Sequence, residues 1–319
     1  MTDALIADKD PSAGLAAQRY QTQLFGDWSG PATYLAPERE RLQSLQWRNF
    51  TARQCSSTIG AEISGIDLRD DLADDVVTEL DQALADYKVL FFRDQPITSE
   101  QQVAFARRFG ELEVHPFIPS NTGVPELVRF EKSAEVAGYE NSWHNDVTWR
   151  EFPSRAAVLH AIRVPDVGGD TLFSDMYAAY DALDDGTKAR IATLDAAHDF
   201  IRAFGGQVPP ERADEMRAQY PVVVHPVVIT HPVTGKQAIY VNRNFTSHIV
   251  GLEPDDSDEL LRLLCRQAEA VEHQVRFPWR NDSIAMWDNL AAQHYASSDY
   301  WPEIRVMERA SITGPRPAR

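Results

Sequence analysis

The sequence predicts an α+β fold that is mostly β, with an antiparallel sheet or a barrel at its centre. Two observations support this prediction: short strand-like runs outnumber the helical patterns, and the helices do not alternate regularly with the strands. In addition, no GxGxxG turn joins a strand to a helix, which disfavours a nucleotide-binding parallel sheet. The chain has 319 residues and is 43% apolar. We therefore expect one large globular domain with a substantial core.

Four segments carry helical signals, either apolar residues at helical spacing or a capping pattern: 73–86, 99–109, 175–194 and 257–272. The second segment begins with Ser99 and Gln102, which have the spacing of a capping box, and it is expected to stop at Gly110. The third segment is expected to break near Asp185-Gly186.

Seven runs have the length and the β-branched or aromatic content of strands: 87–94, 155–162, 222–229, 238–242, 273–278, 282–288 and 304–313. The first of them, "YKVLFFRD", directly follows the helix over 73–86. A helix packed on a sheet is therefore the expected building unit.

Residues 1–46 contain Gly, Pro and aromatic residues with little periodicity. We interpret them as an extension that lies on the surface or between subunits, and we place the domain over 47–319. The net charge of −17 should repel nucleic acid and anionic membranes, so neither is an expected partner. Two cysteines are too few for a disulfide framework, and no leader or apolar span is apparent, which indicates a cytoplasmic protein.

The stretch "SWHNDVTW" places His144 and Asp146 two positions apart between large aromatic residues. On an extended segment both side chains would point the same way and could bind one metal ion. A second imidazole would complete a 2-His-1-carboxylate site, which binds Fe(II) on one face and leaves positions open for cosubstrate and dioxygen. Taken alone, the motif is equally compatible with an ordinary polar pair.

Arg305 and Arg309 are four positions apart on the predicted strand over 304–313, so they share one face and lie about 13 Å apart. Two arginines that point inward would need two anions, and guanidinium groups bind carboxylate or sulfonate in a bidentate manner. The competing interpretation is an exposed strand face with surface ion pairs. His294 stands between the Asp288-Asn289 turn and this strand.

Six blocks of sequence resemble the TauD/TfdA-like (taurine dioxygenase) family of Fe(II)- and 2-oxoglutarate-dependent oxygenases. They are "IGAEISGIDL", "RFGELEVHP", "NSWHNDVTW", "GGDTLF", "HPVVITHPVTGKQAIYVNRNFT" and "DSIAMWDNLAAQHYASSDYWPEIRVMERASITG", and they occur in the family's order from about residue 47 to 314. The His-x-Asp pair, the distal His and the Arg that follows it also have the family's spacing.

The resemblance implies a double-stranded β-helix (jelly-roll) core with flanking helices. It implies Fe(II) bound by His144, Asp146 and His294, with 2-oxoglutarate and O2 as cosubstrates. Arg305 and the Thr171 hydroxyl would bind the distal carboxylate of 2-oxoglutarate. Arg309 and His115 match positions that hold the substrate's anionic group in taurine dioxygenases. Val147, Phe204 and Phe245 match positions that line the pocket, although core packing alone could explain them.

The implied reaction is hydroxylation of an unactivated C–H bond in a small anionic substrate, a sulfonate, sulfate ester or carboxylate, with release of succinate and CO2. The sequence departs from strict taurine enzymes at Ile118, Tyr139 and Glu140, which favours a larger substrate than taurine. The alternative is a natural-product hydroxylase acting on a bulky apolar carboxylate. A catalytically silent binding module and a nucleic-acid demethylase are further alternatives, disfavoured by the intact ligand set and by the charge. Relatives form dimers or tetramers, so a homo-oligomer is expected.

Overall fold

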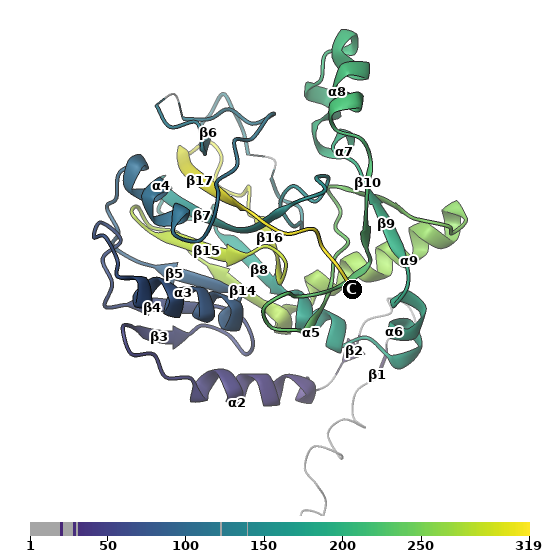
Figure 1. Ribbon diagram of the computed structural model, residues 1–319, viewed down its shortest axis with the longest axis horizontal. Helices are drawn as coiled ribbons and strands as arrows, with labels where there is room; N and C mark the ends of the chain where they lie inside the picture. The colour runs from purple at the N-terminus through teal and green to yellow at the C-terminus, as the bar shows by residue number, and fades with distance from the viewer. Residues whose placement is uncertain (1–19, 22–27, 30, 122, 139) are drawn as a thin grey trace, which may run out of the picture.

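A large sheet forms the centre of the computed structural model, which describes residues 20–21, 28–29, 31–121, 123–138 and 140–319 (Figure 1). The sheet has seven strands in the order β3-β4-β5-β15-β7-β17-β6, and only β4 and β5 pair in parallel. Every residue of β15 is buried, which explains its continuous apolar sequence, because both faces of the sheet are covered. The strands are β3 (Thr51–Gln54), β4 (Ala61–Ser64), β5 (Val89–Phe92), β6 (Leu127–Lys132), β7 (Ser154–Arg163), β15 (Ile284–Asp288) and β17 (Arg305–Thr313).

A three-stranded antiparallel sheet packs against one face of the large sheet. Its order is β14 (Gln274–Phe277), β8 (Thr171–Asp175) and β16 (Ala292–Ala296). Aromatic side chains fill the space between the sheets, and the rings of Phe91 and Phe277 stack with their centroids 4.0 Å apart. The two facing sheets agree with the predicted α+β class and its double-stranded β-helix core.

Two helices, α3 (Asp74–Tyr87) and α4 (Ser99–Arg107), cover the other face of the large sheet. The capping box of α4 lies one residue earlier than predicted: Thr98 and Gln101 form it, not Ser99 and Gln102. The reason is tertiary, because the Ser99 hydroxyl instead donates to buried Glu308, at 2.7 Å.

The remaining strands form smaller sheets. They are β10 (Val223–Pro226), β9 (Asp195–His198) and β13 (Thr246–Ile249) in one sheet, β11 (Val228–Thr230) and β12 (Gln237–Ile239) in a second, and β1 (Tyr20–Gln21) and β2 (Trp28–Ser29) in a third. The run over 222–229, predicted as one strand, is therefore two strands in different sheets. The run over 238–242 is strand only to Ile239.

The other helices are α2 (Ala36–Ser44), α5 (Met176–Asp181), α6 (Asp185–Ile191), α7 (Ile201–Phe204), α8 (Ala213–Gln219) and α9 (Pro254–Arg266). Short 3-10 turns occupy Thr33–Leu35, Gly205–Gln207, Pro210–Arg212, Gln267–Glu269 and Val271–His273. Figure 1 shows α7 and α8 projecting away from the sheets. The predicted helix over 175–194 breaks between α5 and α6, and the one over 257–272 begins earlier and ends in 3-10 turns.

Most of the predicted N-terminal extension lies outside the described residues. Its described part includes α2, whose Leu42 is 1% exposed and belongs to the main core. Glu38 of α2 accepts from Lys88 and Lys236 at 3.1 and 2.8 Å. The 46/47 domain boundary stays a prediction. Within the described ranges, none of the helices has the length and apolar character needed to cross a bilayer.

Candidate active site

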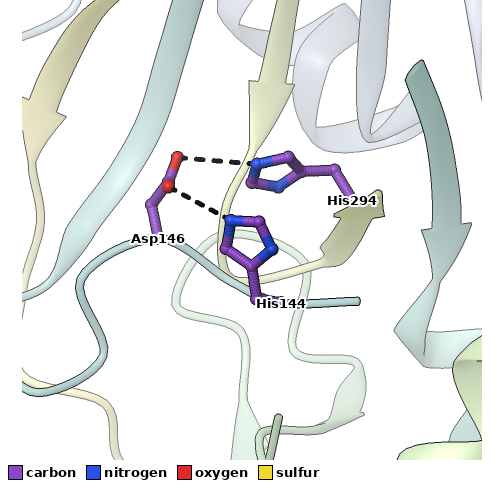
Figure 2. Close-up of side chains that lie close together, drawn as sticks. All are labelled: His144, Asp146 and His294. Atoms are coloured by element: carbon purple, nitrogen blue, oxygen red, sulfur yellow. Dashed lines mark ion pairs between the residues drawn. The ribbon is translucent and has the colours of Figure 1, made fainter. Parts of the chain in front are cut away.

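Three side chains that can bind a metal ion converge beside β16, an edge strand of the three-stranded sheet β14-β8-β16. His294 lies on β16, and its backbone forms an isolated antiparallel bridge with His144. Asp146 lies in the turn that follows, so the two side chains reach the same place from a bridge and a turn, and not from the extended segment that the sequence analysis considered. The nitrogen atoms Nε2 of His144 and His294 lie 3.8 and 4.0 Å from the carboxylate oxygens of Asp146 (Figure 2).

A buried asparagine holds the turn that carries Asp146. The side-chain oxygen of Asn289 accepts the backbone N–H of Asp146 at 2.7 Å, and its amide donates to the Asp146 carbonyl at 3.0 Å. The same amide donates to the carbonyl of Ser154 at 2.8 Å. This role of Asn289 was not predicted from the sequence. The only available signal was an Asp-Asn turn after a strand, which does not reveal a partner 143 residues away.

Both imidazoles are neutral, as metal binding requires. Burial lowers the pKa of His144 and lowers that of His294 to about 3, with the adjacent imidazole adding to the shift of His294. Nδ1 of His144 lies 2.7 Å from the carbonyl oxygen of Ser142. Since a carbonyl can only accept, Nδ1 carries the proton and the lone pair of Nε2 faces Asp146.

Asp146 is ionised although it is buried. Burial would raise its pKa, but the charge of Arg309 is the strongest opposing effect, and the pKa is lowered to about 2. Arg309 donates to the carboxylate from Nη1 at 2.7 Å. Two arginines that point inward were expected to need two anions. Asp146 is one of these anions.

These residues fit a divalent transition-metal ion. One ligand atom from each of His144, Asp146 and His294 lies within 4.8 Å of the others, and all three residues are buried. The second carboxylate oxygen of Asp146 is buried without a hydrogen-bond partner among the described residues, which a bound cation would satisfy. Two imidazole nitrogens and one carboxylate on one face match the donor set of non-haem Fe(II) sites.

A cavity of about 450 Å³ opens beside these three side chains. All ten residues predicted to form the site line it: His115, His144, Asp146, Val147, Thr171, Phe204, Phe245, His294, Arg305 and Arg309. The tertiary structure thus brings together side chains from residue 115 to residue 309. The assignment of a role to each residue remains a prediction.

Arg305 forms one charged end of the cavity. It lies at the start of β17, and its Nε and Nη2 are buried without hydrogen-bond partners among the described residues. Thr171 also lines the cavity, and its hydroxyl oxygen accepts from Trp279 at 2.9 Å, which leaves the hydroxyl hydrogen to donate elsewhere. This end of the cavity can therefore bind a carboxylate.

Arg309 and His115 form a second polar region. Nε of Arg309 is buried and without a partner in the described part of the chain, so Arg309 keeps donor capacity beyond its bond to Asp146. Nδ1 of His115 accepts the backbone N–H groups of Phe117 and Ile118 at 3.2 and 3.0 Å. Burial, with help from Arg309, lowers the pKa of His115 to about 3. His115 is thus a neutral imidazole with Nε2–H as its donor.

The rest of the cavity wall is largely apolar. Val147 has a positive φ of 48°, an unusual conformation for a β-branched residue that is typical of functional sites. Val147, Phe204 and Phe245 belong to one buried cluster, against which Ile118 packs. Glu140 lines the cavity and pairs with Lys132, whereas Tyr139 lies outside the described residues. Phe130 and Lys132 of β6 also line the wall, and neither was predicted from the sequence.

The chain is similar to characterised proteins over most of its length. Residues 51–311 match the family described as "Taurine catabolism dioxygenase TauD, TfdA family". The alkylsulfatase of Acinetobacter baylyi is 34% identical over 280 residues, which cover 85% of this chain and 86% of that protein. The (S)-phenoxypropionate/alpha-ketoglutarate-dioxygenase of Sphingobium herbicidovorans is 35% identical, with 83% and 95% covered. The crystal structure of AAD-2 with Mn(II) and N-oxalylglycine superposes with a TM-score of 0.75 at 32% identity, covering 85% of this chain and 100% of that one.

Proposed function

Because the chain belongs to the TauD, TfdA family and is an alpha-ketoglutarate-dependent dioxygenase, we propose that it hydroxylates a C–H bond next to the sulfate or sulfonate group of a small organic anion. The family resemblance and the fold class expected from the sequence are confirmed. The observation that carries the proposal is the convergence of His144, Asp146 and His294 beside a cavity that Arg305 and Arg309 also line.

The metal would be Fe(II), bound by His144 Nε2, Asp146 and His294 Nε2. When bound, it supplies the dioxygen chemistry that converts 2-oxoglutarate to succinate and CO2 and places one oxygen atom on the substrate carbon. The protein contributes the position of each reactant. Asn289 fixes the turn of Asp146, and Arg309 keeps the carboxylate ionised.

2-Oxoglutarate would bind with its distal carboxylate on Arg305. The buried donors Nε and Nη2 match a carboxylate in a bidentate arrangement, and the Thr171 hydroxyl can add a third hydrogen bond. Because Arg305 is almost completely buried, its charge interacts strongly with a carboxylate that enters the cavity.

The substrate's anionic group would bind between Arg309 and His115. A guanidinium and a neutral N–H donor suit a sulfate ester or sulfonate, whose oxygen atoms stay ionised at all physiological pH values. Glu140, a carboxylate on the cavity wall, is paired with Lys132 at 2.7 Å, so it is poorly suited to bind a substrate ammonium group. This favours alkyl sulfates and alkyl sulfonates over a zwitterion such as taurine. The alkylsulfatase relative supports the sulfate-ester class.

The test is succinate release and product analysis with a panel of alkyl sulfates, alkyl sulfonates, taurine, aryloxypropionates and terpenoid acids under Fe(II) and 2-oxoglutarate. We expect substrate-dependent succinate release with the alkyl sulfates, sulfate as a product, and little activity with taurine. Arg309→Met should raise the KM for the sulfate ester about tenfold or more, because a charge-assisted pair is lost. The Asp146→Ala protein should be inactive, and substrate-coupled succinate formation by it would contradict the metal site.

The second candidate is hydroxylation of a bulky apolar carboxylate in natural-product biosynthesis. The apolar wall with Phe204 and Phe245 favours it. The relatives, however, give more support to sulfur-containing substrates than to apolar carboxylates. Activity confined to the terpenoid acids of the panel would favour this candidate. The predicted homo-oligomer remains a prediction.

A further inference from the structure

A lysine, Lys132, lines the cavity next to Arg305. Lys132 of β6 stands directly opposite Arg305 of β17 in the antiparallel pair, so the two side chains lie on the same face of the sheet. Both residues line the cavity, and the side chain of Lys132 is only 9% exposed. No feature of the sequence resemblance assigned a role to Lys132.

A carboxylate also lines the cavity next to Lys132. Nζ of Lys132 is 2.7 Å from Oε1 of Glu140, which also lines the cavity. Glu140 is near Arg305 as well: burial lowers the pKa of Arg305, and Tyr300, Glu140 and Asp170 oppose that shift. Lys132, Glu140 and Arg305 are thus three charged groups at one end of the cavity.

Together, these three groups carry a net charge of +1. Lys132 neutralises Glu140, and the buried Nε and Nη2 of Arg305 keep no partner within the described residues. If Lys132 were removed, Arg305 would be the only cation of this group of three near Glu140. The carboxylate would then compete with an incoming ligand for Arg305 and repel it, both strongly because the site is buried.

We propose that Lys132 is a positioning residue for 2-oxoglutarate. By pairing with Glu140, Lys132 keeps Arg305 available for the distal carboxylate of 2-oxoglutarate. The proposal rests on the proposed function, because it assumes that Arg305 binds 2-oxoglutarate. A purely structural ion pair would instead affect folding stability and leave 2-oxoglutarate binding unchanged.

The experiment measures 2-oxoglutarate binding to the Mn(II)-loaded protein by calorimetry, together with the KM for 2-oxoglutarate and for the organic substrate under Fe(II). Lys132→Met should weaken 2-oxoglutarate binding about tenfold, with a much smaller change in the KM of the organic substrate. Glu140→Gln alone should bind 2-oxoglutarate more tightly than the wild type. The double variant Lys132→Met/Glu140→Gln should recover most of the affinity lost in Lys132→Met.

A matched control removes a lysine from a Lys–Glu pair outside the cavity. Lys236 pairs with Glu38 at 2.8 Å, and Lys236→Met should leave 2-oxoglutarate binding unchanged. Unchanged binding in Lys132→Met, or a double variant as weak as Lys132→Met, would overturn the proposal. If Lys132→Met does not fold, unchanged binding in Glu140→Gln overturns it.

The failure of the proposed function gives a different result. If the Mn(II)-loaded wild type does not bind 2-oxoglutarate, or if Arg305→Met binds it as tightly as the wild type, the assignment of Arg305 is wrong. If Arg305→Met abolishes binding while Lys132→Met and Glu140→Gln leave it unchanged, only the role of Lys132 is wrong.

Discussion

The protonation state of His115 is decided by its backbone neighbours. A histidine opposite an arginine could be read from the sequence as an imidazolium or as a neutral imidazole. The backbone N–H groups of Phe117 and Ile118 point at Nδ1 and need a lone pair there. Arg309 and Arg150 further disfavour a positive charge. His115 is therefore a fixed hydrogen-bond donor to the cavity, not a titrating cation.

This assignment predicts that the KM for a sulfate ester does not depend on pH between about 5.5 and 8 through His115, because its ordinary pKa of about 6.5 is lowered far below this range. The measurement is the KM of an alkyl sulfate across this range at saturating 2-oxoglutarate. A titrating His115 would make the KM fall as the pH is lowered through about 6.5. His115→Gln is the control, since it would remove such a slope but leave a flat profile flat.

At the scale of single elements, a turn positions Asp146, whereas His294 lies on β16 and His144 pairs with it through a backbone bridge. The turn after β15 supplies Asn289, whose side chain bonds to both backbone groups of Asp146. Asn145 completes the arrangement by donating to the carbonyls of Asn289 and Ala292, at 2.8 and 3.1 Å. Since these bonds join segments more than 140 residues apart, strand register in the sheets determines the geometry of the ligands.

Asn289→Ala should weaken binding of Mn(II) to the protein about 10- to 100-fold, because residues that orient metal ligands have effects of this size. The reason is that the backbone N–H of Asp146 loses its acceptor and the turn is free to shift. Metal titration of the variant measures the effect, with circular dichroism to verify the fold.

Asn281→Ala is the matched control for Asn289→Ala. The Asn281 side chain also accepts a backbone N–H, that of Val164 at 2.9 Å, but it does not line the cavity. Equal metal affinities of the two variants and the wild type would show that Asn289 does not position Asp146.

At the scale of the whole molecule, a buried ionic network joins α2 to the domain. Lys88 is 1% exposed, and its Nζ lies 3.1 Å from carboxylate oxygens of both Glu38 and Asp175. Lys236 and Arg41 also pair with Glu38. The contacts of Glu38 and Leu42 pack α2 against the core, and the domain boundary after residue 46 remains a prediction.

Glu38→Gln should lower the free energy of unfolding by about 3 kcal/mol, because it leaves the buried charge of Lys88 with one fewer partner. Burial would raise the pKa of Glu38, but Arg41, Lys88 and Lys236 outweigh it and hold the pKa well below 4.5. The stabilisation is therefore complete above pH 4.5 and is lost as the pH falls towards the lower pKa of the folded state.

The measurement for this prediction is denaturant unfolding of both proteins at pH 7 and near pH 4. The difference between the wild type and Glu38→Gln should be smaller at the lower pH. Glu40→Gln is the matched control, since Glu40 is exposed on the same helix. A loss in Glu40→Gln as large as that in Glu38→Gln would contradict the role of the network.

The sequence by itself determined the kinds and spacing of the metal-binding side chains, the two arginines on one strand and the α+β class. These features are local, because a strand of alternating side chains places Arg305 and Arg309 on one face wherever it packs. Only the tertiary structure decided that Arg309 holds Asp146, that Asn289 fixes its turn and that Lys132 pairs with Glu140. Most of these partners are far apart in the chain and meet through the register between strands, and none of them leaves a pattern along the sequence.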